Sequence, residues 1–347
     1  MVINGVSNRV APLTRTVING ATVVNQNGLG LPREYNKWNM RWNGYSFAPP
    51  EVGCVLYLPG HPGFGSTILD YSNTFYDSGL NTSEGISATE TGIGTDADPA
   101  TLLPVGSVIR LESELIYVSA SGGPLGNNIE GIRGFEGTPN VSHAIDQDIY
   151  VRTANHGTIS GAVWTQQPSG LWALSYDALD DYVQIAHHSS LLLTTGGTLL
   201  AWIKPTSAGE VNEGRIIDKS DDSNGLNGFC WRVRASVTIG RCSFVINASF
   251  VNASVDSVSW NVWQLVGVTF TAAGAVAHYV NGVAKGTGST SAANLITSTV
   301  VLRLGQKAIG TSATFDGPMC LHRIFNTQLT AAQHATIFNN ERYLFGV

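Results

Sequence analysis

The sequence predicts an all-β protein organised around a β-sandwich. It contains 39 Gly with many Thr, Ser, Val and Asn, and only 13% of its residues are charged, which favours short strands and tight turns over helices. Alternating apolar and polar residues at Tyr182–Ile185 indicate a half-buried strand. A Gly-Gly break then leads into a second apolar strand at 198–203, which stops at Pro205. Two strands at this spacing are typical of a sandwich.

Five motifs follow one another along the chain: Asp180–Val183, Ala201–Pro205, a strand led by Trp263, Tyr279–Gly282 and Phe315–Gly317. In this order they resemble the running pattern of the laminin-G-like family. The resemblance implies a concanavalin-A-like (laminin-G-like) β-sandwich jelly roll. The chain departs from the pattern where His-His usually follows the Trp and where paired acids usually follow Phe-Asp-Gly.

Length and charge limit the function classes. A chain of 347 residues exceeds the usual size of one domain, so we expect two domains or one domain with an appendage. The net charge is −6 and there is no basic tract, which disfavours nucleic-acid binding. No apolar run approaches the roughly 20 residues that cross a bilayer, and the N-terminus lacks a signal-peptide core. We therefore expect no membrane insertion and no export by the general secretory route.

Residues 1–50 predict an extended N-terminal arm, because no strand or helix periodicity there is long enough to form a core. Aromatic residues alternate with cations in this segment, and such residues dominate protein interfaces. We interpret the segment as an anchoring arm that orders on a neighbouring protein, with the alternative that it folds back over its own sandwich. The residues expected to anchor it are Tyr35, Trp38, Arg41, Trp42 and Phe47.

The first strands of the jelly roll are expected at 51–72, followed by an insertion. The family's Leu-Tyr-Leu strand and Asp-x-Ser turn occur there, but the Asn-x-Gly-Thr-Ile strand that normally follows begins only at Asn155. Residues 73–153 would then be an inserted small β-module, and 154–347 the remainder of the jelly roll. Insertion into a surface loop is tolerated because loop-closure entropy rises slowly with length.

The insert has a pattern of its own. A hairpin is expected within 105–118, ending in Glu-x-Ile-x-Val, and an Arg-Gly-x-x-Gly-Thr turn at Arg133–Thr138, His143 and a strand at 149–151 follow. This order resembles a small β-module that recurs in structural proteins of tailed bacteriophages. We expect Arg133 to brace a nearby carboxylate, one of Glu112, Glu114 or Glu136.

Beyond Pro205, strands are expected at 214–219, 228–234 and 241–247, and Asn281-Gly282 predicts a two-residue hairpin turn. A capping box at Thr330–Gln333 predicts a short C-terminal helix.

The four cysteines form no C-x-x-C pair, so buried thiols are expected. The alternatives are disulfides between Cys230 and Cys242 across a predicted hairpin, and between Cys54 and Cys320. The second follows from the family fold, whose first and last strands lie side by side.

Concanavalin-A-like folds include glycoside hydrolases, which need two carboxylates about 5 Å apart. The Glu-x-Asp-x-x-Glu strand that supplies them in this fold is absent. Gly63–Ser66 lacks the ending of a phosphate loop, and His187-His188 has no third ligand at zinc spacing. We therefore expect no enzyme.

The resemblance implies a Ca²⁺ site at the rim, with Asp70, Asp180 and Asp181 as ligands; the alternative is that Asp180 and Asp181 cap a solvated turn. Glycan binding would use exposed aromatics on the rim. The candidates are Trp164, Trp172 and Trp260, with core packing as the alternative.

These observations indicate a non-enzymatic structural and adhesion protein of a tailed-phage virion. We expect capsid decoration or head-fibre attachment, with other virion proteins and further copies of the chain as partners, and a lectin-like jelly roll facing surfaces or glycans. The alternatives are a tail or baseplate adhesin, a stand-alone extracellular carbohydrate-binding lectin, and a degenerate polysaccharide hydrolase.

Overall fold

The structure is a computed structural model that describes residues 14–18, 21–25 and 53–347, apart from 61–62, 69, 71, 73–74, 136–137, 153–154, 223–224, 236–238 and 253–256. β1 (Thr14–Ile18) and β2 (Ala21–Asn25) pair as an antiparallel hairpin. The predicted anchoring residues lie outside the described residues: Tyr35, Trp38, Arg41, Trp42 and Phe47. No described helix is long and apolar enough to cross a membrane.

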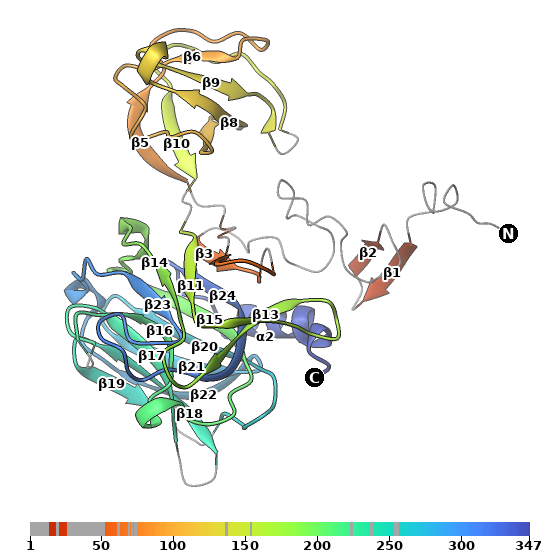
Figure 1. Ribbon diagram of the computed structural model, residues 1–347, viewed down its shortest axis with the longest axis vertical. Helices are drawn as coiled ribbons and strands as arrows, with labels where there is room; N and C mark the ends of the chain where they lie inside the picture. The colour runs from red at the N-terminus through yellow and green to blue at the C-terminus, as the bar shows by residue number, and fades with distance from the viewer. Residues whose placement is uncertain are drawn as a thin grey trace, which may run out of the picture. The chain divides into compact units, whose positions relative to one another are not determined.

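From residue 53 onward the chain divides into two compact units, one made of residues 53–72 and 154–347 and the other of residues 73–153. The first unit is a sandwich of two eight-stranded sheets (Figure 1). Sheet I contains, in spatial order, β19 (Ser249–Asn252), β18 (Gly240–Ile246), β17 (Phe229–Ala235), β16 (Arg215–Lys219), β23 (Leu302–Leu304), β14 (Tyr182–Ile185), β11 (Gly157–Ser160) and β4 (Thr67–Ile68). Sheet II contains β12 (Val163–Gln166), β13 (Trp172–Asp177), β24 (Asp316–Phe325), β15 (Gly196–Ile203), β20 (Gln264–Thr271), β21 (Ala275–Val280) and β22 (Val283–Ser289), and β3 (Cys54–Leu58) also pairs with β24.

One apolar core fills the space between these sheets. Every second residue of β17 is directed into it, so that Phe229, Trp231 and Val233 are fully buried. Phe270 of sheet II lies 4.8 Å from Phe244 and 6.4 Å from Phe229, measured between ring centroids. Burying one such side chain contributes about 1.5–3 kcal/mol. The predicted all-β sandwich is therefore confirmed.

Local signals in the sequence form the expected elements. Asn281 and Gly282 have φ angles of 52° and 76°, the left-handed values that a two-residue hairpin turn between β21 and β22 requires. Helix α2 (Ala331–Glu341) begins with the predicted capping box, in which the Gln333 side chain accepts the N–H of Thr330 at 2.8 Å. The far end of α2 is tied to sheet II, because Glu341 accepts the indole N–H of Trp202 at 2.8 Å.

The second unit is a six-stranded sheet with its own core. In spatial order its strands are β5 (Phe75–Asn81), β10 (Asp148–Arg152), β7 (Val108–Leu111), β8 (Glu114–Ser121), β9 (Asn128–Ile132) and β6 (Gly92–Gly94). β7 and β8 are the hairpin expected within 105–118. The hydrophobic core of this unit is made of aliphatic residues: Leu80, Ile86, Ile93, Leu103, Ile109, Leu111, Ile116, Val118, Ile129, Ile149 and Val151.

A buried ion pair stabilises this unit. Arg133 donates through Nε and Nη2 to the two oxygens of Glu114, each at 2.7 Å. The remaining guanidinium hydrogens reach the carbonyls of Ser87, Glu90 and Val141. Burial alone would raise the pKa of Glu114, but hydrogen bonds from Arg133, Val141, His143 and Gly134 outweigh it and lower that pKa to about 2. The expected bracing role of Arg133 is confirmed, with Glu114 as the partner.

All four cysteines are buried thiols, and none forms a disulfide with another. Cys230 lies opposite Val245 and Cys242 opposite Val233, so the register of β17 and β18 separates them. β3 and β24 do lie side by side, but Cys54 is paired with Phe325, whereas Cys320 is paired with Trp202 of β15. Burial raises the pKa of the Cys230 and Cys242 thiols to about 12, which leaves them unreactive at neutral pH.

Candidate functional site

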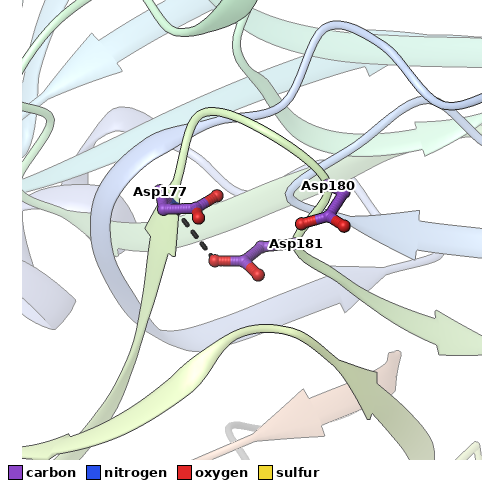
Figure 2. Close-up of side chains that lie close together, drawn as sticks. All are labelled: Asp177, Asp180 and Asp181. Carbon is purple, nitrogen blue, oxygen red and sulfur yellow. Dashed lines mark hydrogen bonds between the residues drawn. The ribbon is translucent and has the colours of Figure 1, made fainter.

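An acidic turn connects β13 to β14 and therefore joins the two sheets. β13 ends at Asp177, the chain reverses through Ala178 with a φ of 65°, and β14 begins directly after Asp181. Carboxylate oxygens of Asp177, Asp180 and Asp181 lie within 4.8 Å of one another. Figure 2 shows Asp177 and Asp181 side by side at the base of the turn, with Asp180 on the same loop. We call these three residues the acidic turn.

Hydrogen bonds hold the geometry of the acidic turn. Asp181 accepts the backbone N–H of Asp177 at 2.9 Å, the bond drawn in Figure 2. Asp177 in turn accepts the N–H of Leu179 at 2.9 Å. Gly161 packs so closely that a Cβ there would lie 2.0 Å from Oδ1 of Asp181, and its φ of 75° also favours glycine. The position of the Asp181 carboxylate is therefore fixed from both sides.

Negative charge is concentrated in this turn. Asp181 is only 5% exposed, whereas Asp177 and Asp180 are exposed. Burial, together with the charges of Asp177 and Asp180, raises the pKa of Asp181 to about 6. Within the described part of the chain, no Lys or Arg forms a salt bridge with any of the three. Hard divalent cations such as Ca²⁺ take oxygen ligands, six to eight in number. Three carboxylates fit such an ion and would leave coordination positions to water or to hydroxyl groups of a ligand.

The structure brings Asp180 and Asp181 together but does not bring Asp70 to them. β11 pairs with β14 so that Ser160 lies opposite Tyr182, which places the acidic turn at the C-terminal end of β11. Asp70 instead contacts Asn155 and His156, which precede that strand. The third carboxylate of the group is that of Asp177, which the sequence analysis did not select. The sequence could have indicated Asp177, because it lies only four positions before Asp181 and a tight turn places such residues next to each other.

Asp70 belongs to an internal network at the other end of β11. Asp70 is 6% exposed, and its carboxylate accepts the backbone N–H groups of Tyr57, Ser72 and Asn155 at 2.8–3.0 Å. The N–H of Asp70 donates to Nδ1 of His156 at 2.9 Å. The Ser72 hydroxyl also donates to this carboxylate at 3.0 Å. With its acceptor capacity used within the protein, Asp70 stabilises this corner of the sandwich.

The three candidate tryptophans are partly buried and do not form one exposed platform. Trp164 packs against the core and donates its indole N–H to the carbonyl of Gly65 at 2.9 Å. The ring of Trp172 lies against Gly63, where a Cβ would be 2.5 Å from it. Trp260 packs against the core at Gly240. Among the described residues, the most exposed large aromatics that the sequence analysis did not select are Phe64 and Phe250, which are 72% and 55% exposed.

Comparison with known families agrees with this architecture. Residues 177–333 match a laminin G family model, described as the concanavalin A-like lectin/glucanases superfamily. Together with the strand order, this match identifies the sandwich as a concanavalin A-like jelly roll. No curated protein sequence matches the chain at a significant level.

Several solved structures are similar. Domain 4 of AbnA, an extracellular GH43 arabinanase from Geobacillus stearothermophilus in complex with arabinotriose, is 15% identical over 52% of this chain and 87% of its own, with a TM-score of 0.40. The botulinum neurotoxin serotype D binding domain is 13% identical over 54% of this chain and 47% of its own, with a TM-score of 0.40. The binding domain of Paraclostridial Mosquitocidal Protein 1 is 13% identical over 52% of this chain and 46% of its own, with a TM-score of 0.40. This chain spans about half the length of the two toxin domains.

Proposed function

We propose that this chain is a non-enzymatic adhesion protein of a tailed-phage virion, and that its jelly roll binds glycans through a Ca²⁺ ion held by the acidic turn. The observation that carries the binding role is the convergence of Asp177, Asp180 and Asp181 within 4.8 Å. A Ca²⁺ ion there would offset two of the three negative charges and present open positions to vicinal sugar hydroxyls. The match of residues 177–333 to a superfamily of lectins and glucanases supports a saccharide ligand.

The arrangement of these carboxylates favours binding over hydrolysis. A glycosidase places an acid and a base or nucleophile on opposite sides of the scissile bond. The three carboxylates of the acidic turn instead project from one loop of five residues, 177–181, and Asp181 is fixed by the N–H of Asp177. A sugar would therefore meet them from one side only.

The virion assignment rests on the inserted unit. Residues 73–153 resemble, through the Glu114–Val118 strand and the Arg133–Thr138 turn, a module of tailed-phage structural proteins. Capsid decoration or head-fibre attachment is the role we propose, with other virion proteins and copies of the same chain as partners. The protein would then be located on the virion surface.

Two measurements test this function. Mass spectrometry of purified particles should find the chain in stoichiometric amounts on the capsid; its presence in tail fractions would favour a baseplate adhesin, and its absence from particles would favour a stand-alone lectin.

A glycan array with Ca²⁺ and with chelator should show binding only with the ion. Asp180→Asn should remove that binding and Asp148→Asn, an exposed acid of the inserted unit, should not. Hydrolysis of any bound glycan would instead indicate a polysaccharide hydrolase.

A further inference from the structure

The outer face of sheet I, away from the sandwich core, carries a group of polar and aromatic side chains. None of them belongs to the acidic turn. Trp231, Phe244 and Val251 of three adjacent strands are directed into the core. The residues that alternate with them therefore lie on the opposite face. We call this group the arginine face; it consists of Arg232, Arg234, Arg241, Ser243, Phe250 and Asn252.

The strand register arranges the arginine face in rows across β17, β18 and β19. Arg234 lies directly opposite Arg241. In the next row, Arg232 is opposite Ser243, which is in turn opposite Asn252. Phe250 is paired with Val245, one row further along. The distance from the first row to the third is about 13 Å, because each residue of a strand advances about 3.3 Å.

This face has more positive charge than its carboxylates neutralise. Glu213 is shared by three guanidinium groups, those of Arg215, Arg232 and Arg234, at 3.5, 2.8 and 3.6 Å. Arg215 also contacts Asp218 at 2.9 Å. Arg241 forms no salt bridge within the described part of the chain. Among the described residues, four guanidinium groups therefore face two carboxylates, a surplus of two positive charges in a chain whose net charge is −6.

The strand pairing indicates that this surplus serves a ligand. Like charges directly opposite each other destabilise a sheet, as Arg234 and Arg241 do here.

The chemistry of the arginine face fits an acidic saccharide. Guanidinium groups bind carboxylates through paired, charge-assisted hydrogen bonds. The partly exposed Asn252 offers a partner for hydroxyl groups, and the exposed ring of Phe250 offers an apolar surface for one face of a sugar ring. The side chain of Arg234, 36% exposed, is accessible to such a ligand.

We propose that the arginine face is a second binding site, which takes an oligosaccharide bearing a sugar carboxylate. The carboxylate pairs with Arg234 and Arg241, and the chain of the ligand runs along the strands toward Phe250. This inference rests on the proposed function only in taking the ligand to be a saccharide. It requires neither Ca²⁺ nor the acidic turn.

Isothermal titration of the full chain with oligogalacturonate, oligomannuronate and sialyllactose, each beside its methyl ester, tests this proposal. All titrations contain chelator, so that a Ca²⁺-dependent site contributes nothing. At least one acid form should bind, and its ester at least tenfold more weakly. Arg241→Gln and Phe250→Ser should each weaken binding at least tenfold, whereas Arg342→Gln, which removes an exposed arginine near the C-terminus, should leave it unchanged.

Stability separates loss of the site from loss of the fold. Arg241→Gln relieves the repulsion with Arg234, so its melting temperature should equal or exceed that of the native chain. Equal binding of acid and ester, full binding by Arg241→Gln, or no binding of any acid in chelator would each overturn the second site. Binding that requires Ca²⁺ and is equally strong for the acid and its ester would support a site at the acidic turn and none at the arginine face.

Discussion

The carboxylate of Asp70 accepts the backbone N–H of Asn155 at 3.0 Å, although the two residues are 85 positions apart in the chain. The side-chain amide of Asn155 then donates to the carbonyl of Val55 at 3.0 Å, so strand β3 joins the same network. These bonds hold together the two points of the sandwich between which residues 73–153 leave and return. The sandwich therefore contains, within its own residues, the contacts that close this loop.

Removing the Asp70 carboxylate should destabilise the sandwich. Asp70→Ala leaves the buried N–H groups of Tyr57, Ser72 and Asn155 without an acceptor, and each such group costs about 1–3 kcal/mol. We expect a loss of roughly 3 kcal/mol or more in the free energy of unfolding, measured by urea denaturation. Asp148→Ala, at an exposed acid, is the control. Equal stability of the two variants would contradict the role given to Asp70.

Deleting the inserted unit should leave a folded sandwich. If residues 73–153 are replaced by a short Gly-Ser bridge, the Asp70 network still joins Tyr57 to Asn155, and loop closure becomes slightly more favourable. Calorimetry should show one cooperative transition, and circular dichroism should retain the β signal. A shortened chain with no cooperative transition would count against independent units.

Calcium should raise the melting temperature at neutral pH. At 100 times its dissociation constant, an ion that binds only the folded state adds about 2.7 kcal/mol of stability. The Asp180→Ala/Asp181→Ala variant should show no such increase, while Asp148→Ala should respond like the native chain. If the native chain gave identical melting curves with calcium and with chelator, the acidic turn would bind no calcium and would be a solvated turn.

The calcium effect should depend on pH with a defined sign. The folded state raises the pKa of Asp181 to about 6, above its ordinary value, so the folded chain binds this proton more tightly than the unfolded chain. Without calcium, the contribution of Asp181 to stability should therefore increase as pH falls through about 6. Since the proton and the ion compete for the carboxylate, the calcium-dependent increase should shrink over the same range. Melting curves at pH 7.5, 6 and 4.5 measure both effects; a calcium response that is constant with pH would contradict them.

The inserted unit should lose stability in acid. Its folded structure lowers the pKa of Glu114 to about 2, so the stabilisation is complete above the unfolded value and is lost as pH falls from about 4.5 toward 2. Glu114→Gln should remove about 3–5 kcal/mol at neutral pH, because it leaves Arg133 buried without its partner. Hydrogen exchange in β8 and β9 reports on this unit, with Glu84→Gln as the control. Unchanged protection in Glu114→Gln would show that the ion pair is dispensable.

The anchoring arm remains a prediction. Removing residues 1–50 should give a chain that no longer binds particles or self-associates, because the aromatic side chains at Trp38, Trp42 and Phe47 are removed. Co-sedimentation with particles and light scattering measure the two losses. Undiminished assembly of the shortened chain would exclude an anchoring role.

The sequence by itself determined the elements whose signals are local. Alternation over four residues predicted β14, Asn281-Gly282 predicted the turn between β21 and β22, and Thr330–Gln333 predicted the start of α2. Each of these depends on backbone preferences and hydrogen bonds within a few residues, so no knowledge of distant partners was needed. The order of the motifs was enough to predict the jelly roll.

Only the tertiary structure decided which side chains meet. The pairing of β11 with β14 places Asp70 and Asp181 at opposite ends of a strand, and the turn after β13 brings Asp177 to Asp181 instead. The register of β17 with β18 likewise separates Cys230 from Cys242 and sets Arg234 opposite Arg241. The physical reason is that a shift of one residue in strand pairing changes every cross-strand neighbour and the face on which it lies. That register is set by burial across the whole sandwich, which no short stretch of sequence contains.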